Sequence, residues 1–196
     1  VAGGYINPPG TSLEADSYNG TSWSEIAELN SAKNESQGFG NSATSGYVVR
    51  SEQEFWNGST WTEVNDLVTP RGLASVTGTS TAAILGGGEA GPPARNLVET
   101  WDGTSWTEVS EINTNREAGS AMSGTTTSAI ISVGYTGTAN TTNSETWNGS
   151  SWTEGNDANL ARQRVDYAGS TVPTALIIGG LVGTPSPTTV TGNTES

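Results

Sequence analysis

The chain has 196 residues, with 20 acidic and 7 basic side chains that give a net charge of −13. This charge argues against a nucleic-acid partner, which requires a basic surface, and against binding to anionic membranes. The sequence contains no Cys and no His, which excludes structural zinc, blue copper and Ser-His-Asp chemistry. No apolar run approaches the roughly 18 residues of a membrane span. We therefore expect no membrane insertion, no metal and no cofactor.

One eleven-residue pattern occurs four times along the chain. The copies are DSYNGTSWSEI (16–26), EFWNGSTWTEV (54–64), ETWDGTSWTEV (99–109) and ETWNGSSWTEG (145–155). Successive copies are separated by 38, 45 and 46 residues when they are aligned on their second aromatic residue. A repeat of this length is typical of propeller blades, so we interpret it as a rule of packing and not as four active sites.

Each copy places Asn-Gly or Asp-Gly between two aromatic-rich extended runs. This dipeptide is a strong hairpin signal, because a tight primed turn needs positive φ at both central residues. We therefore expect hairpin turns at 19–20, 57–58, 102–103 and 148–149.

An apolar run that ends in glycine precedes the repeated pattern, as in AAILGGG (82–88), SAIISVG (128–134) and TALIIGG (174–180). The first unit keeps only VAGG (1–4), and the second unit has the degenerate GYVVRSE (46–52). Small-residue strands such as 74–80 and 167–172 lie before the full runs. One unit is thus four short antiparallel strands, and we expect no helix longer than about one turn because no apolar period of 3.6 residues is present.

Aromatic and basic residues recur in phase with the repeat. A four-stranded blade cannot bury both faces alone, so stacked blades should bury the aromatic residues between them. A Glu two positions before the first aromatic and a cation ten positions after the second could form a bidentate pair between blades. The repeated residues expected to be structural are Tyr18, Trp23, Trp56, Trp61, Trp101, Trp106, Trp147, Trp152, Lys33, Arg71, Arg116 and Arg162.

The Gly-Gly after an apolar strand, the aromatic residue beyond it, the later Trp and the Arg that opens the next unit resemble the kelch repeat. The resemblance spans nearly the whole chain and implies an all-β fold, a kelch-like β-propeller with about four to five four-stranded antiparallel blades in a larger ring. The units are approximately 1–30, 31–68, 69–113, 114–160 and a partial 161–196. The second unit lacks Gly-Gly, and the fourth run has Val133-Gly134 in its place. The sequences WDGTSWTE and WNGSSWTE also resemble repeats in structural proteins of tailed bacteriophages, particularly marine ones.

The two ends of the chain duplicate one another, because VAGG (1–4) and IIGG (177–180) belong to the same strand of the repeat. Ring closure by pairing of the ends would require complementary strands. We therefore expect the chain to be a window from a longer array.

The sequence does not match the catalytic motifs of enzyme families with related architecture. The Asp box of sialidase-like propellers has a residue between its Asp and Gly, whereas Asp102-Gly103 are adjacent. The copper site of galactose oxidase needs Cys and His. A carboxylate pair for glycoside hydrolysis stays open, but the acids recur with the repeat, whereas catalytic residues are usually singular. We expect no enzymatic activity.

The loops that differ between units lie at 5–12, 89–96, 135–143 and 181–192 and are rich in Gly, Pro, Thr and Asn. In a propeller they share one face with the connections between blades, and variable loops on a rigid scaffold commonly bind ligands. This loop face should also receive Glu28, Asp66, Glu111 and Asp157 and should therefore be acidic. The candidate ligand-binding residues are Asn7, Glu89, Arg95 and Thr136.

Arg95 is one of three basic residues outside the repeat phase, together with Arg50 and Arg164. It sits in a loop with two prolines, which we expect to present it to solvent. A solvated arginine that eases local repulsion is the alternative to a contact with a carboxylate or sugar.

The sequence predicts a non-enzymatic structural or binding propeller domain of a larger protein. The resemblance of the repeat sequence to phage structural proteins favours an exposed virion component, such as a tail, fibre or decoration protein, on the virion surface or outside the cell. Its partners would be other virion subunits in an oligomeric assembly and a host surface glycan or protein. The alternatives are an extracellular carbohydrate-active or carbohydrate-binding propeller and a kelch-type protein-interaction adaptor.

Overall fold

The computed structural model describes residues 2–6, 10–91, 95–117, 120–183, 189–192 and 194–195. Regular structure in these residues is β-strand, apart from the 3-10 helix Val172–Thr174. The expectation of no helix longer than about one turn is confirmed for this part of the chain. No helix among these residues has the length and apolar character needed to cross a membrane.

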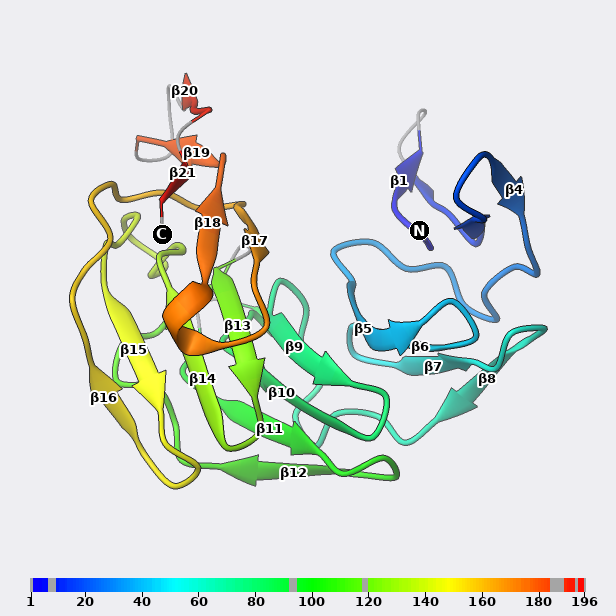
Figure 1. Cartoon of the computed structure of the whole chain (residues 1–196), viewed down its shortest axis with the longest axis horizontal. Coiled ribbons are helices and arrows are strands. Elements are labelled where there is room, and N and C mark those ends of the chain that lie inside the picture. The colour runs from blue at the N-terminus through cyan, green and yellow to red at the C-terminus, as the bar shows by residue number, and fades with distance from the viewer. Residues whose placement is uncertain are drawn as a thin grey trace.

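Three antiparallel sheets of four strands form the centre of the molecule. Their strands are β5 (Gln37–Ser42), β6 (Ser45–Val49), β7 (Gln53–Trp56) and β8 (Trp61–Val64); β9 (Ser75–Thr79), β10 (Ala82–Gly86), β11 (Val98–Trp101) and β12 (Trp106–Val109); and β13 (Ala121–Thr125), β14 (Ser128–Ser132), β15 (Ser144–Trp147) and β16 (Trp152–Glu154). Each strand pairs with its neighbours in sequence, so every sheet is a simple meander. The sheets follow one another around an arc as blades of a propeller (Figure 1).

Smaller sheets continue the arc at both ends (Figure 1). Their strands are β1 (Tyr5–Ile6), β2 (Gly10–Thr11), β3 (Asp16–Tyr18) and β4 (Trp23–Glu25) on the N-terminal side, and β17 (Asp166–Ala168), β18 (Leu176–Ile178), β19 (Leu181–Val182), β20 (Thr189–Val190) and β21 (Thr194–Glu195) on the C-terminal side. Strands β17, β18 and β21 form one sheet, whereas β3–β4, β1–β2 and β19–β20 are hairpins. The predicted all-β propeller built from four-stranded antiparallel blades is confirmed.

The repeated Asn-Gly and Asp-Gly dipeptides all lie in hairpin turns, as predicted, but the turn is not the primed two-residue type. Trp101 pairs directly with Trp106, so four residues, Asp102 to Ser105, connect the strands. Positive φ occurs at Gly103 (97°) but not at Asp102. The carboxylate Oδ1 of Asp102 instead accepts hydrogen bonds of 2.8 Å from the backbone N–H groups of Thr104 and Ser105. The Asn or Asp is therefore selected for its side-chain acceptor and not for left-handed backbone.

We expect Asn148→Ala to lower the free energy of unfolding by about 1 kcal/mol, because it removes two side-chain-to-backbone hydrogen bonds at an exposed turn. Asn148 Oδ1 accepts from Ser150 N at 2.9 Å and from Ser151 N at 3.0 Å. Urea unfolding measures the change. Ser150→Ala is the control, because Ser150 is exposed in the same turn, and equal effects of the two substitutions would contradict this role of Asn148.

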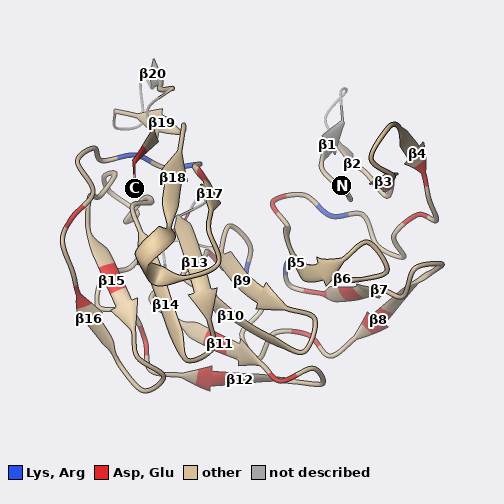
Figure 2. Cartoon of the chain, in the orientation of Figure 1, with Lys and Arg blue, Asp and Glu red and all other residues tan. Residues whose placement is uncertain are grey.

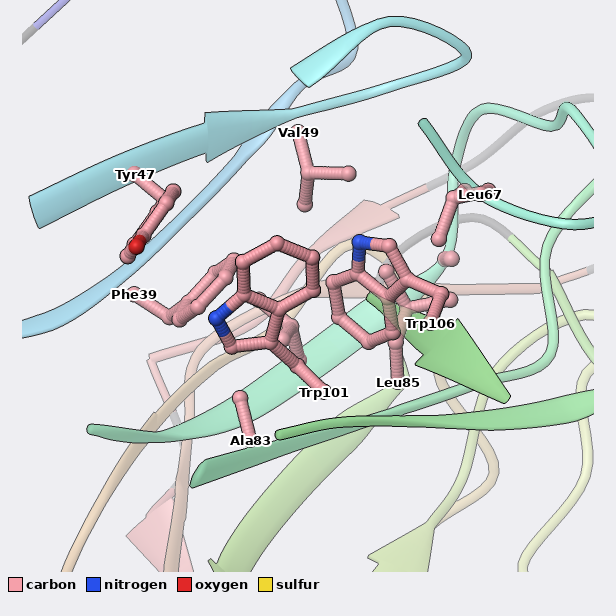
Figure 3. Close-up of a cluster of buried hydrophobic side chains, with 10 residues drawn as sticks. Phe39, Tyr47, Val49, Leu67, Ala83, Leu85, Trp101 and Trp106 are labelled. Carbon is pink, nitrogen blue, oxygen red and sulfur yellow. The ribbon is translucent and has the colours of Figure 1, made fainter. Parts of the chain in front are cut away.

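The aromatic residues of the repeat pack between consecutive blades. Trp101 and Trp106 of one blade form a cluster with Phe39 and Tyr47 of the preceding blade, as Figure 3 shows. Trp147 and Trp152 pack in the same way against the blade before theirs. Trp56 is also buried, and Trp61 is half-buried. The prediction of a blade core is confirmed for these positions.

The first copy of the repeat departs from this pattern. Tyr18 is 50% exposed and Trp23 is 58% exposed, although both were expected to be buried. The repeat directs this aromatic pair toward a preceding blade, and the described residues contain no blade on that side of β3 and β4. The two rings keep the contact with each other that the other copies also make, with centroids 5.2 Å apart.

Candidate functional site

The cations in repeat phase form buried ion pairs with the repeated acids. Arg71 contacts Glu99, and its equivalents make the corresponding contacts. The other pairs are Lys33 Nζ with Glu54 Oε1 at 2.8 Å, Arg116 Nη2 with Glu145 Oε1 at 2.7 Å, and Arg162 Nη2 with Glu195 Oε1 at 3.0 Å. Each cation lies in the connection that leads into a blade, and each acid lies on the third strand of that blade. Figure 2 marks these acids on β7, β11 and β15 in red.

The carboxylates also bind the backbone of the connection. Glu145 accepts hydrogen bonds from Asn113 N at 2.6 Å and Thr114 N at 3.0 Å, in addition to Arg116. The predicted bidentate fork is therefore wrong for this pair: one guanidinium nitrogen meets the carboxylate, and backbone donors supply the remaining hydrogen bonds. Burial lowers the pKa of Arg116, and the charge of Glu145 offsets part of that effect.

The same arrangement holds Glu54 in its ionised form. Burial opposes ionisation, but Lys33 and the N–H groups of Asn30 and Ser31 together lower the pKa of Glu54 below its ordinary value. The repeated charges are thus engaged in fixing each connection to the blade that follows it. Polar groups that are available to a ligand must be sought among the residues outside the repeat.

A polar recess of about 340 Å³ lies on the loop face and is lined mainly by such residues. It receives Glu35 from the connection after β4, Arg50 from the β6–β7 loop, and Glu89 from the loop after β10. Gly72 and the buried Arg71, from the connection between β8 and β9, also line it. We call this hollow the loop-face recess.

The backbone around the loop-face recess is closely fitted. Glu89 and Gly72 exchange two backbone hydrogen bonds of 2.8 Å. Arg50 lies close to Gly72, where a Cβ atom would be 3.1 Å from Arg50 Nε, so a side chain at position 72 would require the guanidinium to shift by a few tenths of an ångström. Arg50 Nη2 is 3.7 Å from Glu35 Oε2, an ion pair longer than a hydrogen bond.

A left-handed backbone position recurs two residues after the repeat cation. Glu35, Leu73 and Arg164 have φ values of 52°, 53° and 53°, in a region that non-glycine residues seldom adopt. The residue type at this position changes from unit to unit while the conformation does not. Strained positions of variable identity on a rigid scaffold are suited to binding, because the repeat fixes their geometry.

A pair of carboxyl groups lies beside the loop-face recess. Glu117 follows the cation Arg116, and Gly88 N donates to Arg116 O at 2.8 Å, which brings Glu89 close to Glu117. Burial, and then the negative charge of Glu89 and its hydrogen bond, raise the pKa of Glu117 to about 7. One proton can thus be held between two carboxyl groups near neutral pH.

We expect the free energy of unfolding to fall, relative to a Glu117→Gln variant, as the pH is raised from about 5 to about 8. The folded-state pKa of Glu117 lies above its unfolded value, so the stabilising protonated form is complete at low pH and is lost as the pH passes about 7. Chemical denaturation of both proteins across this range measures the difference. Parallel pH profiles would show that Glu117 ionises normally.

The structure separates the four predicted ligand-binding residues. Asn7 lies outside the described residues. Glu89 lines the loop-face recess, whereas Arg95 and Thr136 do not. Arg95 is half-buried and its Nε is buried, which contradicts its expected presentation to solvent. Its backbone is also held in place, because its N–H donates to Gly88 O at 2.9 Å and its carbonyl accepts from Arg116 N at 3.1 Å. Thr136 Oγ1 accepts from Ala139 N at 3.2 Å and so stabilises its own loop.

The repeated acids Glu28, Asp66, Glu111 and Asp157 are exposed. Two of them bind variable loops: Glu111 accepts from Asn96 Nδ2 at 2.6 Å, and Asp157 accepts from Thr142 Oγ1 at 3.2 Å. Asp66 instead accepts from Gln53 N at the start of β7, at 2.9 Å. Sequence reasoning did not select Arg50, Glu35 and Glu117 as site residues. Arg50 could have been identified from the sequence, because it is one of three basic residues outside the repeat phase.

Comparison with known proteins supports the fold and nothing finer. No protein-family model matches the chain, and no curated protein matches it. A solved structure described as "Structure of YjhT" is similar, with a TM-score of 0.74 and 14% sequence identity over 97% of this chain and 79% of that chain. The likeness places this chain with β-propeller-like folds.

Proposed function

We propose that this chain is a non-enzymatic structural and binding propeller domain, displayed on a virion as a tail, fibre or decoration component that contacts a host surface through its loop face. The observation that carries the proposal is that repeated and non-repeated charged residues have different contacts. Repeated charges bind the connections between blades, as Glu145 does with Arg116. Charges outside the repeat, Arg50 and Glu89, meet at one recess.

The resemblance of the repeat sequence to phage structural proteins supports the virion assignment. The negative charge of the chain, −13, is in keeping with an exposed domain, because a large net charge keeps a surface soluble and discourages non-specific association. An interaction adaptor or a carbohydrate-active propeller would use the same loop face, so the host-surface assignment needs a direct test.

The test is binding of the immobilised chain to cell-envelope preparations from a panel of marine bacteria, measured by biolayer interferometry. The proposal expects saturable binding to some envelopes, which the Arg50→Gln/Glu89→Gln variant loses. Arg164→Gln is the matched control, because Arg164, like Arg50, is a basic residue outside the repeat phase and is exposed but does not line the loop-face recess. Failure of the parent chain to bind any envelope would count against host attachment.

A further inference from the structure

The guanidinium of Arg50 lies at the loop-face recess without a hydrogen-bond acceptor. Within the described residues, Arg50 Nε is buried and has no hydrogen-bond partner, and Arg50 Nη2 is 3.7 Å from Glu35 Oε2, which is beyond hydrogen-bond distance. Arg71 also lines the recess, and its Nη2 has no partner either. Buried polar groups in folded proteins are usually hydrogen-bonded. Two arginines with unpaired N–H groups at one hollow therefore indicate that a bound molecule supplies acceptors there.

The charges around the recess restrict what that molecule can be. Arg71 is neutralised by Glu99, which leaves the single positive charge of Arg50 facing the carboxylates of Glu35 and Glu89. An anionic ligand would therefore meet net negative charge. A cationic ligand would satisfy the carboxylates but would leave the arginine N–H groups without acceptors.

Hydroxyl groups meet both requirements, because each one donates a hydrogen bond and accepts others. Two adjacent hydroxyls could donate to Glu89 and accept from Arg50. The guanidinium is within reach of a ligand, because the side chain of Arg50 is 39% exposed. The volume of about 340 Å³ is at the lower end of the roughly 300–1,000 Å³ typical of ligand pockets, which fits a ligand of one or two sugar rings.

We propose that the loop-face recess binds the vicinal diol of a neutral saccharide, with Glu89 accepting from the diol and Arg50 donating to it. Gly72 is a positioning residue, since the absence of a side chain there leaves room for the guanidinium of Arg50 beside it. This inference rests on the proposed function and specifies the ligand of the same face.

The experiment is titration of the chain with lactose, maltotriose, methyl α-mannoside and N-acetylglucosamine trisaccharide, with sialyllactose as an acidic comparison, by saturation-transfer NMR and calorimetry. At least one neutral probe should bind more tightly than the acidic probe. Arg50→Gln and Glu89→Gln should each weaken that binding about 10- to 100-fold, as loss of a hydrogen bond to a charged group does. Gly72→Ala should weaken it without removing a contact, and Arg164→Gln should leave it unchanged.

Several results would overturn the inference. They are the absence of binding by every neutral probe, tighter binding of sialyllactose, and undiminished binding by a folded Arg50→Gln variant. Loss of binding in Trp23→Ala instead would move the sugar to the separate aromatic hollow beside Tyr18, Trp23 and Trp61. Envelope binding that persists after periodate oxidation of the envelope glycans would overturn the saccharide inference while leaving host attachment standing.

Discussion

Trp106→Ala is expected to lower the free energy of unfolding by about 3–5 kcal/mol, as deletion of a large buried aromatic side chain does. Trp106 lies between two blades and is 5% exposed. Its ring meets Phe39 of the preceding blade edge-on, with centroids 5.8 Å apart. Its Nε1 donates to Gln53 Oε1 at 2.7 Å. The substitution therefore leaves a cavity and an unpaired buried amide in one step.

The matched control is Trp23→Ala, which removes the same residue from the same position of the repeat. Because Trp23 is 58% exposed, its loss should change the free energy of unfolding by less than about 1 kcal/mol. Guanidinium unfolding followed by circular dichroism compares the two variants without relying on tryptophan fluorescence. Similar effects of both substitutions would contradict the assignment of Trp106 to the packing between blades.

Glu145→Gln is expected to cost about 3–5 kcal/mol, because it leaves the positive charge of Arg116 buried without a counter-charge. Both side chains of the pair are fully buried. The new amide NH2 would also face donors, since Asn113 N and Thr114 N both point at the carboxylate. The connection between blades should loosen, and its amide hydrogens should exchange faster.

Glu154→Gln is the control for this prediction. Glu154 is paired directly across the hairpin with Glu145 but is exposed. Its neutralisation should change the free energy of unfolding by no more than about 0.5 kcal/mol. If the two glutamines had equal effects, the buried pair would contribute no more than an ordinary surface charge does.

Much of the architecture can be predicted from the sequence because each unit of the repeat shows the same pattern of turn, aromatic and charged residues. Four positions of the turn dipeptide fixed the hairpins, and the phase of Arg116 with Glu145 indicated a pair that the structure places at 2.7 Å. Comparison of the units shows which residues all of them share, and these shared residues are the ones that every blade requires. The turn type was predicted wrongly because Asn-Gly and Asp-Gly are each compatible with two turn types, and only the strand pairing, Trp101 with Trp106 and Trp147 with Trp152, distinguishes them.

The loop-face recess could not be predicted in the same way, because it is made by residues that occur once. Glu35, Arg50 and Glu89 come from three different connections, and no spacing in the sequence brings them together. The exposure of Arg95 was predicted wrongly because a proline-flanked loop suggested exposure, whereas the side chain is half-buried and its Nε is buried. Exposure of Trp23 likewise depends on a neighbouring surface that its own repeat does not specify.

The central claim is that residues in repeat phase build the propeller and residues outside that phase bind its ligand. The most direct test is envelope binding by the Arg50→Gln/Glu89→Gln variant, measured on protein whose unfolding has been checked. We predict at least a tenfold loss of binding, with a free energy of unfolding within about 1 kcal/mol of the parent. Unchanged binding by the folded variant would contradict the claim and would assign the ligand to another surface.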